Sequence, residues 1–443
     1  MNIFKRHKYA QDSGVMMFYM LLITVFLLPF SGDAATYTLF LGWFFCIMKA
    51  YFGDWKWIKT PIDIPLAIFV CFVFFSIINS PQKMFSFYNA YHLIGKYLLI
   101  YYLAVQSITT EKHIKTVFVV LGISAVIVLL YGFFQYFVGI NTAGMDWTDT
   151  KTFPEVTRRI FSTWENPNLL AGYLNIIMAL AFGTFIFAGG RTVRIIIGSF
   201  LILAAIGLGL TYARGAYLSI VMVIAAYGVF CKRKIIFPLV VLLAGLMYID
   251  TPLFNRMTSI FTTIDTSSEL RLALWESTIE MILDHPLLGI GWGAYYFVYP
   301  SYDFYMQGNF IKVVHAHNMY LNIAAEIGLV GFAAFITCLG GNIWRALKVY
   351  KHLSTNFLRG ALLGCGLALT AIAFNGFTDF VLFNTRLTML FCTVMAVEAA
   401  LLRHPSLLAI QKELQRRRMG LVSLPELSDE EIQKNKAYNL KDI

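Results

Sequence analysis

Twelve long apolar runs divide this sequence, and they constrain its fold more than any other feature. Each run is long enough, or nearly so, to cross the ~30 Å of hydrocarbon in a lipid bilayer. Only 14% of the residues are charged, whereas a soluble protein carries about a quarter. We therefore predict an all-α integral membrane protein with about twelve transmembrane helices. The runs lie near residues 14–31, 35–52, 61–80, 91–108, 116–140, 169–189, 194–212, 216–230, 235–250, 317–344, 357–378 and 386–402.

The distribution of Lys and Arg predicts which ends of these helices face the cytoplasm. An even number of spans places both termini on one side, and the segments FKRHK at the start and QKELQRRR near the end are basic. Cytoplasmic loops carry an excess of Lys and Arg, whereas the external loops predicted at about 141–168 and 251–315 are poor in them. We expect a polytopic domain over 1–402 in the cytoplasmic (inner) membrane, both termini in the cytoplasm, a cytoplasmic tail over 403–443, and the long loops in the periplasm.

The sequence lacks the motifs of several common catalytic classes. It contains no HExxH motif, P-loop, GxSxG motif, DxD-type cluster or Cys/His zinc spacing. The six cysteines lie in or at the ends of apolar runs, where they serve as packing residues. The net charge of +10 is spread over many loops and does not form one basic soluble face. We therefore expect the lipid bilayer as a partner, and no metal, cofactor or nucleic acid.

The loop over 251–315 is predicted to be partly helical. The segment SSELRLALWESTIEMILDHP starts with Ser267 and Ser268 as N-cap candidates and repeats apolar residues at near-helical spacing up to Pro286. We predict an amphipathic helix over about 268–284, lying on the outer membrane surface. The following segment, LLGIGWGAYYFVYPSYDFY, is dense in Gly, Tyr and Trp. Such aromatic side chains suit a membrane interface and can stack on a glycan.

Ionisable residues gather at the predicted outer ends of the helices, and polar groups so costly in lipid invite a functional explanation. His315 and His317 open the tenth apolar run. Arg214 lies at a tight outer turn, Arg271 heads the amphipathic helix, and Arg159 lies in the first external loop. Arg donates two parallel hydrogen bonds to a phosphate, and a neutral imidazole can take a proton from a hydroxyl. The pattern therefore predicts attack by an alcohol on a lipid-linked phosphate donor.

Five segments occur together in the order of one known family. His317, Asn318, Gly328 and Gly331 form the pattern His-Asn, nine residues, Gly, two residues, Gly. The other segments are ENPNLLAGYL, TYARGAYL, RLALWESTIEMILDHPLLGIGWG and DFVLFNTR. Together they resemble the O-antigen ligase and polymerase superfamily of multi-pass bacterial glycosyltransferases, over roughly residues 159–395. The first five apolar runs match that family only in hydropathy.

The resemblance implies a GT-C-like fold and a metal-independent glycosyltransferase. The implied donor is a glycan on undecaprenyl diphosphate, and the implied acceptor is a hydroxyl outside the cytoplasmic membrane, on lipid A-core or another glycan. Direct attack by that hydroxyl inverts the anomeric centre. The resemblance implies that His317 is the general base and that Arg214 and Arg271 bind the diphosphate leaving group. Arg159 is a further candidate for binding the diphosphate.

Four further residues are expected to support the site, namely His315, Asn318, Asp379 and Arg386. His315 stands two residues before His317, a spacing that points its side chain elsewhere along a helix or turn. Asp379 either positions the acceptor or forms a salt bridge with Arg386.

Polar and small residues deeper in the tenth run are interpreted as structural. Glu326 and Asn322 are four residues apart on one helix face and are expected to interact. Gly328 and Gly331 are expected to allow close helix packing.

The hypothesis that we favour is O-antigen ligation to lipid A-core, because one dominant external loop suits the admission of a large amphiphilic acceptor. The alternatives are an O-antigen or exopolysaccharide polymerase and a protein O-oligosaccharyltransferase, which use the same donor. A polytopic transporter is a more remote alternative. Transporters place ionisable groups near the membrane midplane in two repeated halves, whereas here they concentrate at one face.

Overall fold

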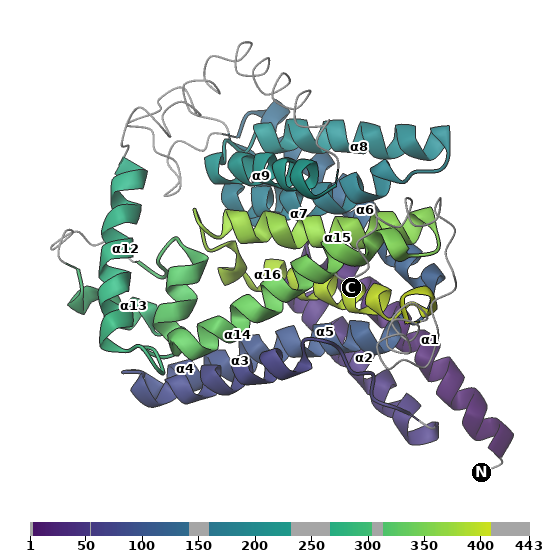
Figure 1. Cartoon of the computed structure of the whole chain (residues 1–443), viewed down its shortest axis with the longest axis horizontal. Helices are drawn as coiled ribbons and strands as arrows, with labels where there is room; N and C mark the ends of the chain where they lie inside the picture. Colours follow the sequence, from purple (N-terminus) through teal and green to yellow (C-terminus); the bar gives the residue numbers. More distant parts are fainter. Residues whose placement is uncertain (1–2, 54, 141–158, 232–265, 304–312, 409–443) are drawn as a thin grey trace, which may run out of the picture.

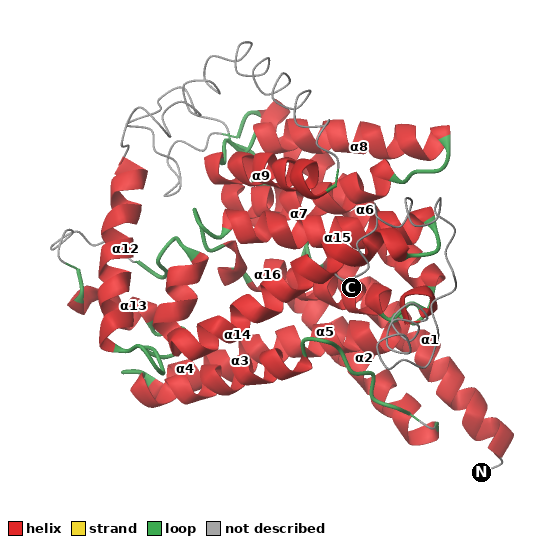
Figure 2. Ribbon diagram, viewed as in Figure 1, coloured by secondary structure: helices red, strands yellow, loops and turns green. Residues whose placement is uncertain are grey.

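The computed structural model describes residues 3–53, 55–140, 159–231, 266–303 and 313–408, and every regular element in these ranges is a helix (Figure 2). Eight of the described helices are long and apolar enough to cross a membrane. The predicted class, an all-α multi-pass membrane protein, is therefore confirmed. The long helices are α1 (Ile3–Leu27), α2 (Gly32–Phe52), α6 (Glu111–Val138), α7 (Pro167–Ile186), α8 (Arg191–Gly209), α14 (Met319–Val349), α15 (Asn356–Asn375) and α16 (Thr385–Leu402).

The shorter helices account for most of the difference between the eight long helices and the predicted count. All predicted runs except 235–250 coincide with described helices, and 235–250 lies outside the described residues. The shorter elements are α3 (Asp63–Ser76), η1 (Ile77–Asn79), α4 (Lys83–Asn89), η2 (Ala90–Ile94), α5 (Gly95–Ser107), η3 (Ser162–Trp164), α9 (Arg214–Phe230), α12 (Thr266–Asp284), α13 (Tyr295–Val298), η5 (Tyr299–Ser301), η6 (Tyr350–His352) and η7 (Val381–Phe383). Helix α3 continues into the 3-10 turn η1, and the π-helical turn η2 joins α4 to α5.

Small residues let the central helices approach closely. At Gly183 of α7 a side chain would overlap the backbone of α15 at Gly364, so the two helices touch along their backbones. At Gly331 of α14 a Cβ atom would lie 2.9 Å from the Cβ of Phe72 in α3, which confirms the close packing predicted for Gly331. Such small-residue contacts are a common way for helices to associate in lipid, where apolar side chains gain little from leaving the solvent.

The polar residues of interest lie at one end of this bundle. α14 and α16 begin there and α15 ends there, and the N–H of Met319 donates to the carbonyl of Gly376 across 2.8 Å. We call this end the site face, which lies to the left in Figure 1, and the other end the opposite face. At the opposite face, Arg403 donates from Nη2 to the carbonyl of Val105 across 3.0 Å. α1 also begins at that face.

Helix α14 is broken at Gly328, and the glycine-rich loop after α12 is inserted at the break. Gly328 has φ 73° and ψ 172°, a conformation that is essentially restricted to glycine. A side chain there would overlap the carbonyl oxygen of Leu287. The N–H groups of Ile290 and Gly291 donate to the carbonyls of Ala325 and Glu326, across 2.8 and 3.0 Å. The prediction that Gly328 allows close helix packing is therefore wrong. Gly328 instead allows an interruption of α14, into which the loop after α12 is inserted.

Glu326 fixes the same loop from inside the bundle. Its buried carboxylate accepts hydrogen bonds from Asn322 and from the backbone N–H groups of Gly293 and Tyr295. Asn322 in turn accepts from the N–H of Ala316, across 3.0 Å. The predicted interaction of Glu326 with Asn322 is confirmed, and it ties α14 to the segment that leads from α12 back to the site face.

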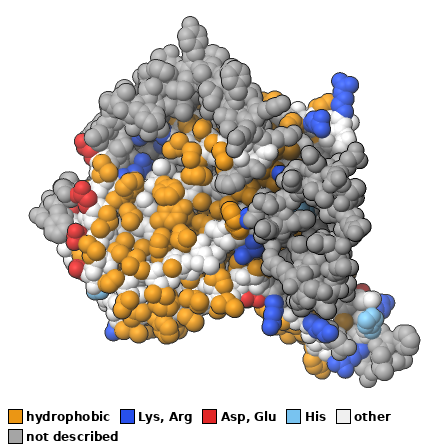
Figure 3. Space-filling view, viewed as in Figure 1, with side chains coloured by type: hydrophobic (Ala, Val, Ile, Leu, Met, Phe, Trp, Pro, Cys, Tyr) orange, Lys and Arg blue, Asp and Glu red, His pale blue; other side chains and the backbone are white. Residues whose placement is uncertain are grey.

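Large apolar side chains cover the flanks of the bundle between the two faces. Figure 3 shows a broad hydrophobic surface over the helices, with the charged side chains gathered toward the edges. Outward-facing aromatic and branched side chains on α2, α6 and α8 are highly exposed, as expected of a surface in contact with lipid. Examples are Phe40, Phe44, Ile47, Phe134, Phe137, Ile196 and Ile202.

Candidate active site

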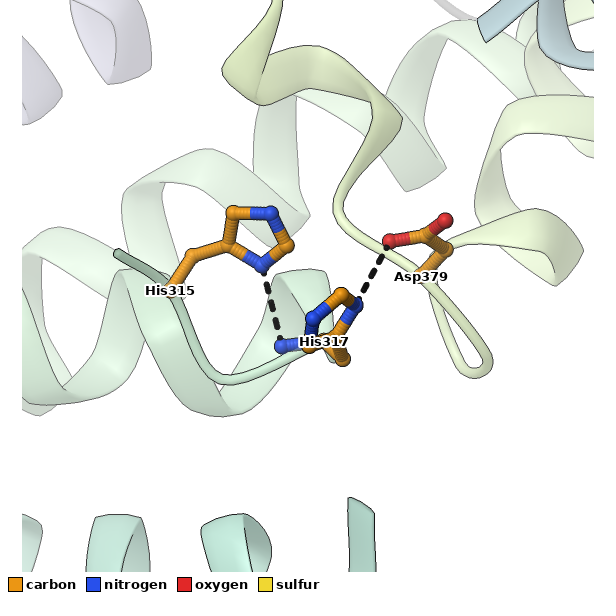
Figure 4. A group of neighbouring side chains, drawn as sticks. All are labelled: His315, His317 and Asp379. Atoms are coloured by element: carbon orange, nitrogen blue, oxygen red, sulfur yellow. Dashed lines mark hydrogen bonds and ion pairs between the residues drawn. The ribbon is translucent and has the colours of Figure 1, made fainter. Parts of the chain in front are cut away.

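The two predicted histidines and Asp379 meet at the site face (Figure 4). His315 and His317 lie in the segment just before α14, and Asp379 lies in the turn between α15 and η7. The centroids of the two imidazole rings are 4.3 Å apart. The sequence-based expectation that His315 points away from His317 is wrong, because these residues precede the helix and do not follow helical geometry.

The backbone at His317 is held in a left-handed conformation by the start of α14. Its φ is 48°, a value that non-glycine residues adopt at a cost of about 1–3 kcal/mol and that clusters at functional sites. Asn318 is the N-cap of the helix, and its Oδ1 accepts from the N–H groups of Tyr320 and Leu321 across 3.0 and 3.1 Å. Asn318 therefore supports the site by fixing the turn that presents His317, and it is itself buried.

His317 is paired with Asp379 through the ring nitrogen Nδ1. The distance from Nδ1 to Oδ1 of Asp379 is 3.3 Å, and 37% of the His317 side chain is exposed against 16% of Asp379. A carboxylate accepts only, so Nδ1 must carry the proton, and Nε2 of a neutral His317 keeps its lone pair. A histidine oriented in this way is ready to accept a proton from a hydroxyl, as in other carboxylate–histidine pairs.

Asp379 is held in place by two further donors. Its Oδ1 accepts from the N–H of Phe380 across 2.8 Å, and its Oδ2 accepts from Nδ2 of Asn168 across 3.2 Å. Burial alone raises the pKa of Asp379, but the hydrogen bond to His317 and the electrostatic interactions with both histidines and Arg271 outweigh burial and lower that pKa below its ordinary value. Asp379 is therefore a carboxylate at neutral pH.

His315 supports His317 as a neutral acceptor. Its Nδ1 accepts from the backbone N–H of His317 across 3.1 Å, so the proton of a neutral His315 resides on Nε2. The rings of Phe380 and Phe383 enclose it, with centroids 6.1 and 5.0 Å away. Burial lowers the pKa of His315 to about 4, and the charges of His317 and Arg271 act in the same direction, against Asp379. His315 stays uncharged near neutral pH.

Arg271 brings a positive charge to this cluster from α12. It lies near the start of that helix, within the predicted range 268–284, and interacts electrostatically with both His315 and Asp379. Its Nε is buried and has no hydrogen-bond partner among the described residues. A guanidinium with an unused donor, close to an imidazole base, is suited to binding an anion.

Arg214 is the first residue of α9, and the start of that helix lies close to the turn that carries Asp379. The following residue, Gly215, lies directly against Thr378, where a side chain would overlap the Thr378 hydroxyl. Thr378 immediately precedes Asp379, so this glycine contact fixes the start of α9 beside the turn that carries Asp379. The structure thereby places the predicted residue Arg214 in the neighbourhood of the carboxylate.

Arg159, predicted as a further ligand of the diphosphate, is buried and donates hydrogen bonds within the protein. Only 6% of the residue is exposed. Its Nε donates to the carbonyl of Thr211 across 2.8 Å, and its Nη2 donates to Oδ1 of Asn168 across 3.2 Å. Asn168 then donates to Asp379, so Arg159 supports the carboxylate through Asn168. Asn168 was not among the predicted site residues, although it lies in the segment ENPNLLAGYL and in the first turn of α7, close to the N-cap Asn166.

Arg386 does not pair with Asp379, so that sequence-based alternative is wrong. Its Nη1 donates to the carbonyl of Thr163 across 3.0 Å, its Nη2 lies 3.5 Å from Glu165, and the guanidinium lies 5.0 Å from the ring centroid of Trp164. Arg386 therefore holds the segment after the first long loop against α16. The physical reason is that the η7 turn lies between Asp379 and Arg386. Arg386, in the first turn of α16, therefore faces residues 163–165 and not Asp379.

The spacing of the cluster also meets a simple criterion for metal ligation. Ligand atoms of His315, His317 and Asp379 all lie within 4.8 Å of one another. One ring nitrogen of each histidine is already engaged, because Nδ1 of His315 accepts a backbone N–H and Nδ1 of His317 faces the carboxylate. The positive charge of Arg271 beside them also disfavours a divalent cation. The arrangement fits a hydrogen-bonded base better than a metal centre.

A large apolar cavity opens beside the cluster. Its volume is about 650 Å³, and it extends between α3, α5, α14 and α16. Val314, Phe380 and Phe383 line it next to His315, and Trp292, Tyr97 and Met395 line it farther away. Phe380 and Phe383 separate the cavity from His315. Most of its wall is apolar, so it suits a hydrocarbon chain whose polar end lies near the cluster.

Comparison with known proteins agrees with the resemblance found in the sequence. The family model described as O-Antigen ligase matches residues 199–336. The matched segment contains Arg214, Arg271, His315 and His317, and Asp379 lies outside it. Among curated proteins, no significant match was found. The predicted resemblance to the O-antigen ligase superfamily is therefore confirmed over this segment of the multi-pass membrane protein.

Proposed function

We propose that this protein transfers a glycan from undecaprenyl diphosphate to an acceptor hydroxyl at the site face. The family match supports an O-antigen ligase-like or polymerase-family function at the coarser level. The observation that carries the finer proposal is the His317–Asp379 pair beside the unused donor of Arg271. A base and a separate cation are the two groups that attack on a glycosyl diphosphate requires.

In the proposed reaction, Nε2 of His317 takes the proton of the acceptor hydroxyl. The acceptor oxygen attacks the anomeric carbon, and the bond from that carbon to the diphosphate oxygen breaks with its electron pair leaving on the diphosphate. Attack from the face opposite the leaving group inverts the anomeric centre. Asp379 stabilises the imidazolium that forms, because the pair is hydrogen-bonded and Asp379 is ionised.

Arginines take the part that a carboxylic acid plays in a glycosidase. A diphosphate leaving group needs neutralisation more than protonation, and Arg271 and Arg214 supply positive charge without a metal. Arg159 is assigned to positioning, because its Nε and Nη2 donate to Thr211 and Asn168. The apolar cavity beside His315 accommodates the polyprenyl chain of the donor in this proposal.

Ligation to lipid A-core is the reaction that we favour within this class. The family model that matches is described as O-Antigen ligase. In addition, residues 266–303 form one large, mostly helical segment at the site face. Polymerisation of O-antigen or exopolysaccharide is the second candidate, because it uses the same donor and the same leaving group. The catalytic residues do not distinguish the two, since only the acceptor differs. Such a protein would act in the inner membrane with its site face in the periplasm.

Deleting the gene and separating the lipopolysaccharide on a gel tests the proposal. Loss of a ligase leaves bare core and strands full-length glycan on its lipid carrier, and plasmid-borne wild type but not His317→Ala restores the ladder. Core capped by a single repeat unit would identify a polymerase instead. An unchanged lipopolysaccharide profile would contradict both ligation and O-antigen polymerisation, and would point to exopolysaccharide or to a different acceptor.

A further inference from the structure

A second cavity lies at the opposite face, far from the candidate active site. Its volume is about 740 Å³, and α1, the end of α2 and the start of α6 surround it. α2 has 21 residues, so it rises about 31 Å between its ends. It begins at the site face, where Gly32 lies against Arg386, and ends at this cavity with Lys49 and Gly53. The cavity is therefore separated from the catalytic cluster by the thickness of the bundle.

Positive groups line the mouth of this cavity. Lys49, Lys112 and His7 are among its lining residues, which include no Asp or Glu in the described parts of the chain. The described ion pairs involve neither lysine. Both lysines lie close enough to His113 to interact with it electrostatically. Figure 3 shows Lys, Arg and His side chains gathered at the end of the molecule where α1 begins.

The path of Lys49 is fixed by the packing of α1 on α2. Its Cδ, Cε and Nζ atoms pass 3.5, 3.6 and 3.8 Å from the position of a Cβ on Gly14. The aliphatic stem thus crosses the surface of α1 at a glycine and carries the ammonium group to the cavity mouth. Lys112 lies in the first turn of α6, where the start of the helix carries a partial positive charge. The acidic residue of that turn, Glu111, is paired with Lys115 across 2.7 Å.

Apolar side chains form much of the remaining wall of the cavity. Phe18 stacks on the His113 ring with centroids 4.1 Å apart, and Val15, Leu22 and Trp55 also line the space. A small hydrophilic anion would gain nothing from these walls. A molecule with a phosphate at one end and a hydrocarbon chain at the other would satisfy both parts of the cavity.

We propose that this cavity binds an anionic phospholipid of the leaflet at the opposite face, with its phosphate between Lys49 and Lys112 and its chains along α1. Basic pockets between membrane helices recognise such headgroups, at about 1 kcal/mol for each Lys or Arg near the surface. The proposal does not depend on the glycosyltransferase function, because it concerns different residues at the other end of the molecule.

Native mass spectrometry of the full-length purified protein, titrated with phosphatidylglycerol or phosphatidylcholine, tests this proposal. We expect retained adducts with phosphatidylglycerol and weak ones with phosphatidylcholine. The double variant Lys49→Gln, Lys112→Gln should weaken phosphatidylglycerol binding about 30-fold, since two contributions of about 1 kcal/mol correspond to that factor. The control Lys351→Gln, an exposed lysine outside the cavity, should bind normally. A melting curve in detergent without added lipid verifies that each variant is folded.

Three results would overturn the proposal. Equal binding of the two lipids, or equal losses in the double variant and in Lys351→Gln, would mean that the cavity does not select a headgroup. Displacement of phosphatidylglycerol by millimolar inorganic phosphate would make this a site for a free anion. Binding only by a chain that ends at Leu408 would show that the C-terminal tail, and not a lipid, fills the cavity in the full-length protein.

Discussion

Replacing Gly328 by alanine is expected to destabilise the protein and to disable the site face, although Gly328 is remote from the chemistry. The backbone of Gly328 lies in a glycine-only conformation, with φ 73° and ψ 172°, and a Cβ there would overlap the Leu287 carbonyl. Keeping this conformation with alanine costs about 1–3 kcal/mol. Relieving the overlap moves the loop. This weakens the hydrogen bonds that Ile290 and Gly291 donate to α14 and the one that Leu329 donates to Pro286, each contributing about 1 kcal/mol.

The two effects together predict a loss of about 3–6 kcal/mol. The assay is the apparent melting temperature of the purified protein in detergent, measured beside Gly340→Ala. Gly340 lies in the same helix with nothing within 4 Å of its Cβ position. Alanine there should leave stability unchanged or raise it by up to about 1 kcal/mol, from helix propensity alone. Equal melting temperatures for Gly328→Ala and Gly340→Ala would refute the inference that the inserted loop depends on this glycine.

The remaining predictions concern the polar cluster. Asp379→Asn should reduce transfer by at least about 100-fold, because an amide does not hold the His317 tautomer with Nε2 free; an unchanged rate removes the pair from the mechanism. Arg271→Lys should weaken donor binding, since lysine lacks the bidentate fork, while Arg191→Lys at the exposed start of α8 should bind donor normally. Transfer should persist in a chelator, and loss restored by magnesium or manganese would contradict this. His315 has a pKa of about 4 in the folded protein, below its ordinary 6.5, so unfolded chains bind more protons between these values. The melting temperature should fall as pH drops from 6.5 toward 4, and less so in His315→Gln; equal slopes would refute this.

Hydropathy and the distribution of charge were sufficient to predict the fold class and the end of the bundle that carries the polar residues. A span needs a long apolar run, and an ionisable residue at its end is conspicuous against that background. His317 and Arg271 were identified in this way, and the structure brings both toward Asp379. The helix over 268–284 was predictable from the spacing of its apolar residues.

Other features depend on backbone conformations that no periodic pattern encodes. The left-handed turn at His317 brings the imidazole rings of His315 and His317 together, whereas helical spacing predicts that they point apart. The break at Gly328 requires a loop from elsewhere in the chain, so the glycine alone indicated only close packing. Arg159 and Arg386 were both predicted to lie at the outer face near the site. Each instead donates to a backbone carbonyl of a segment distant in sequence. Partners of that kind become visible only in three dimensions.

The central claim is that His317 is the base of a glycosyl transfer, and the most direct measurement is the turnover of purified variants. The reaction contains undecaprenyl diphosphate-linked glycan and lipid A-core, and His317→Gln is compared with wild type and with His404→Gln, a matched change at the opposite face. The account predicts that His317→Gln loses about 10²–10⁴-fold in turnover while donor binding and melting temperature stay near those of wild type. His404→Gln should retain normal turnover. Turnover by His317→Gln within a few-fold of wild type would contradict the account.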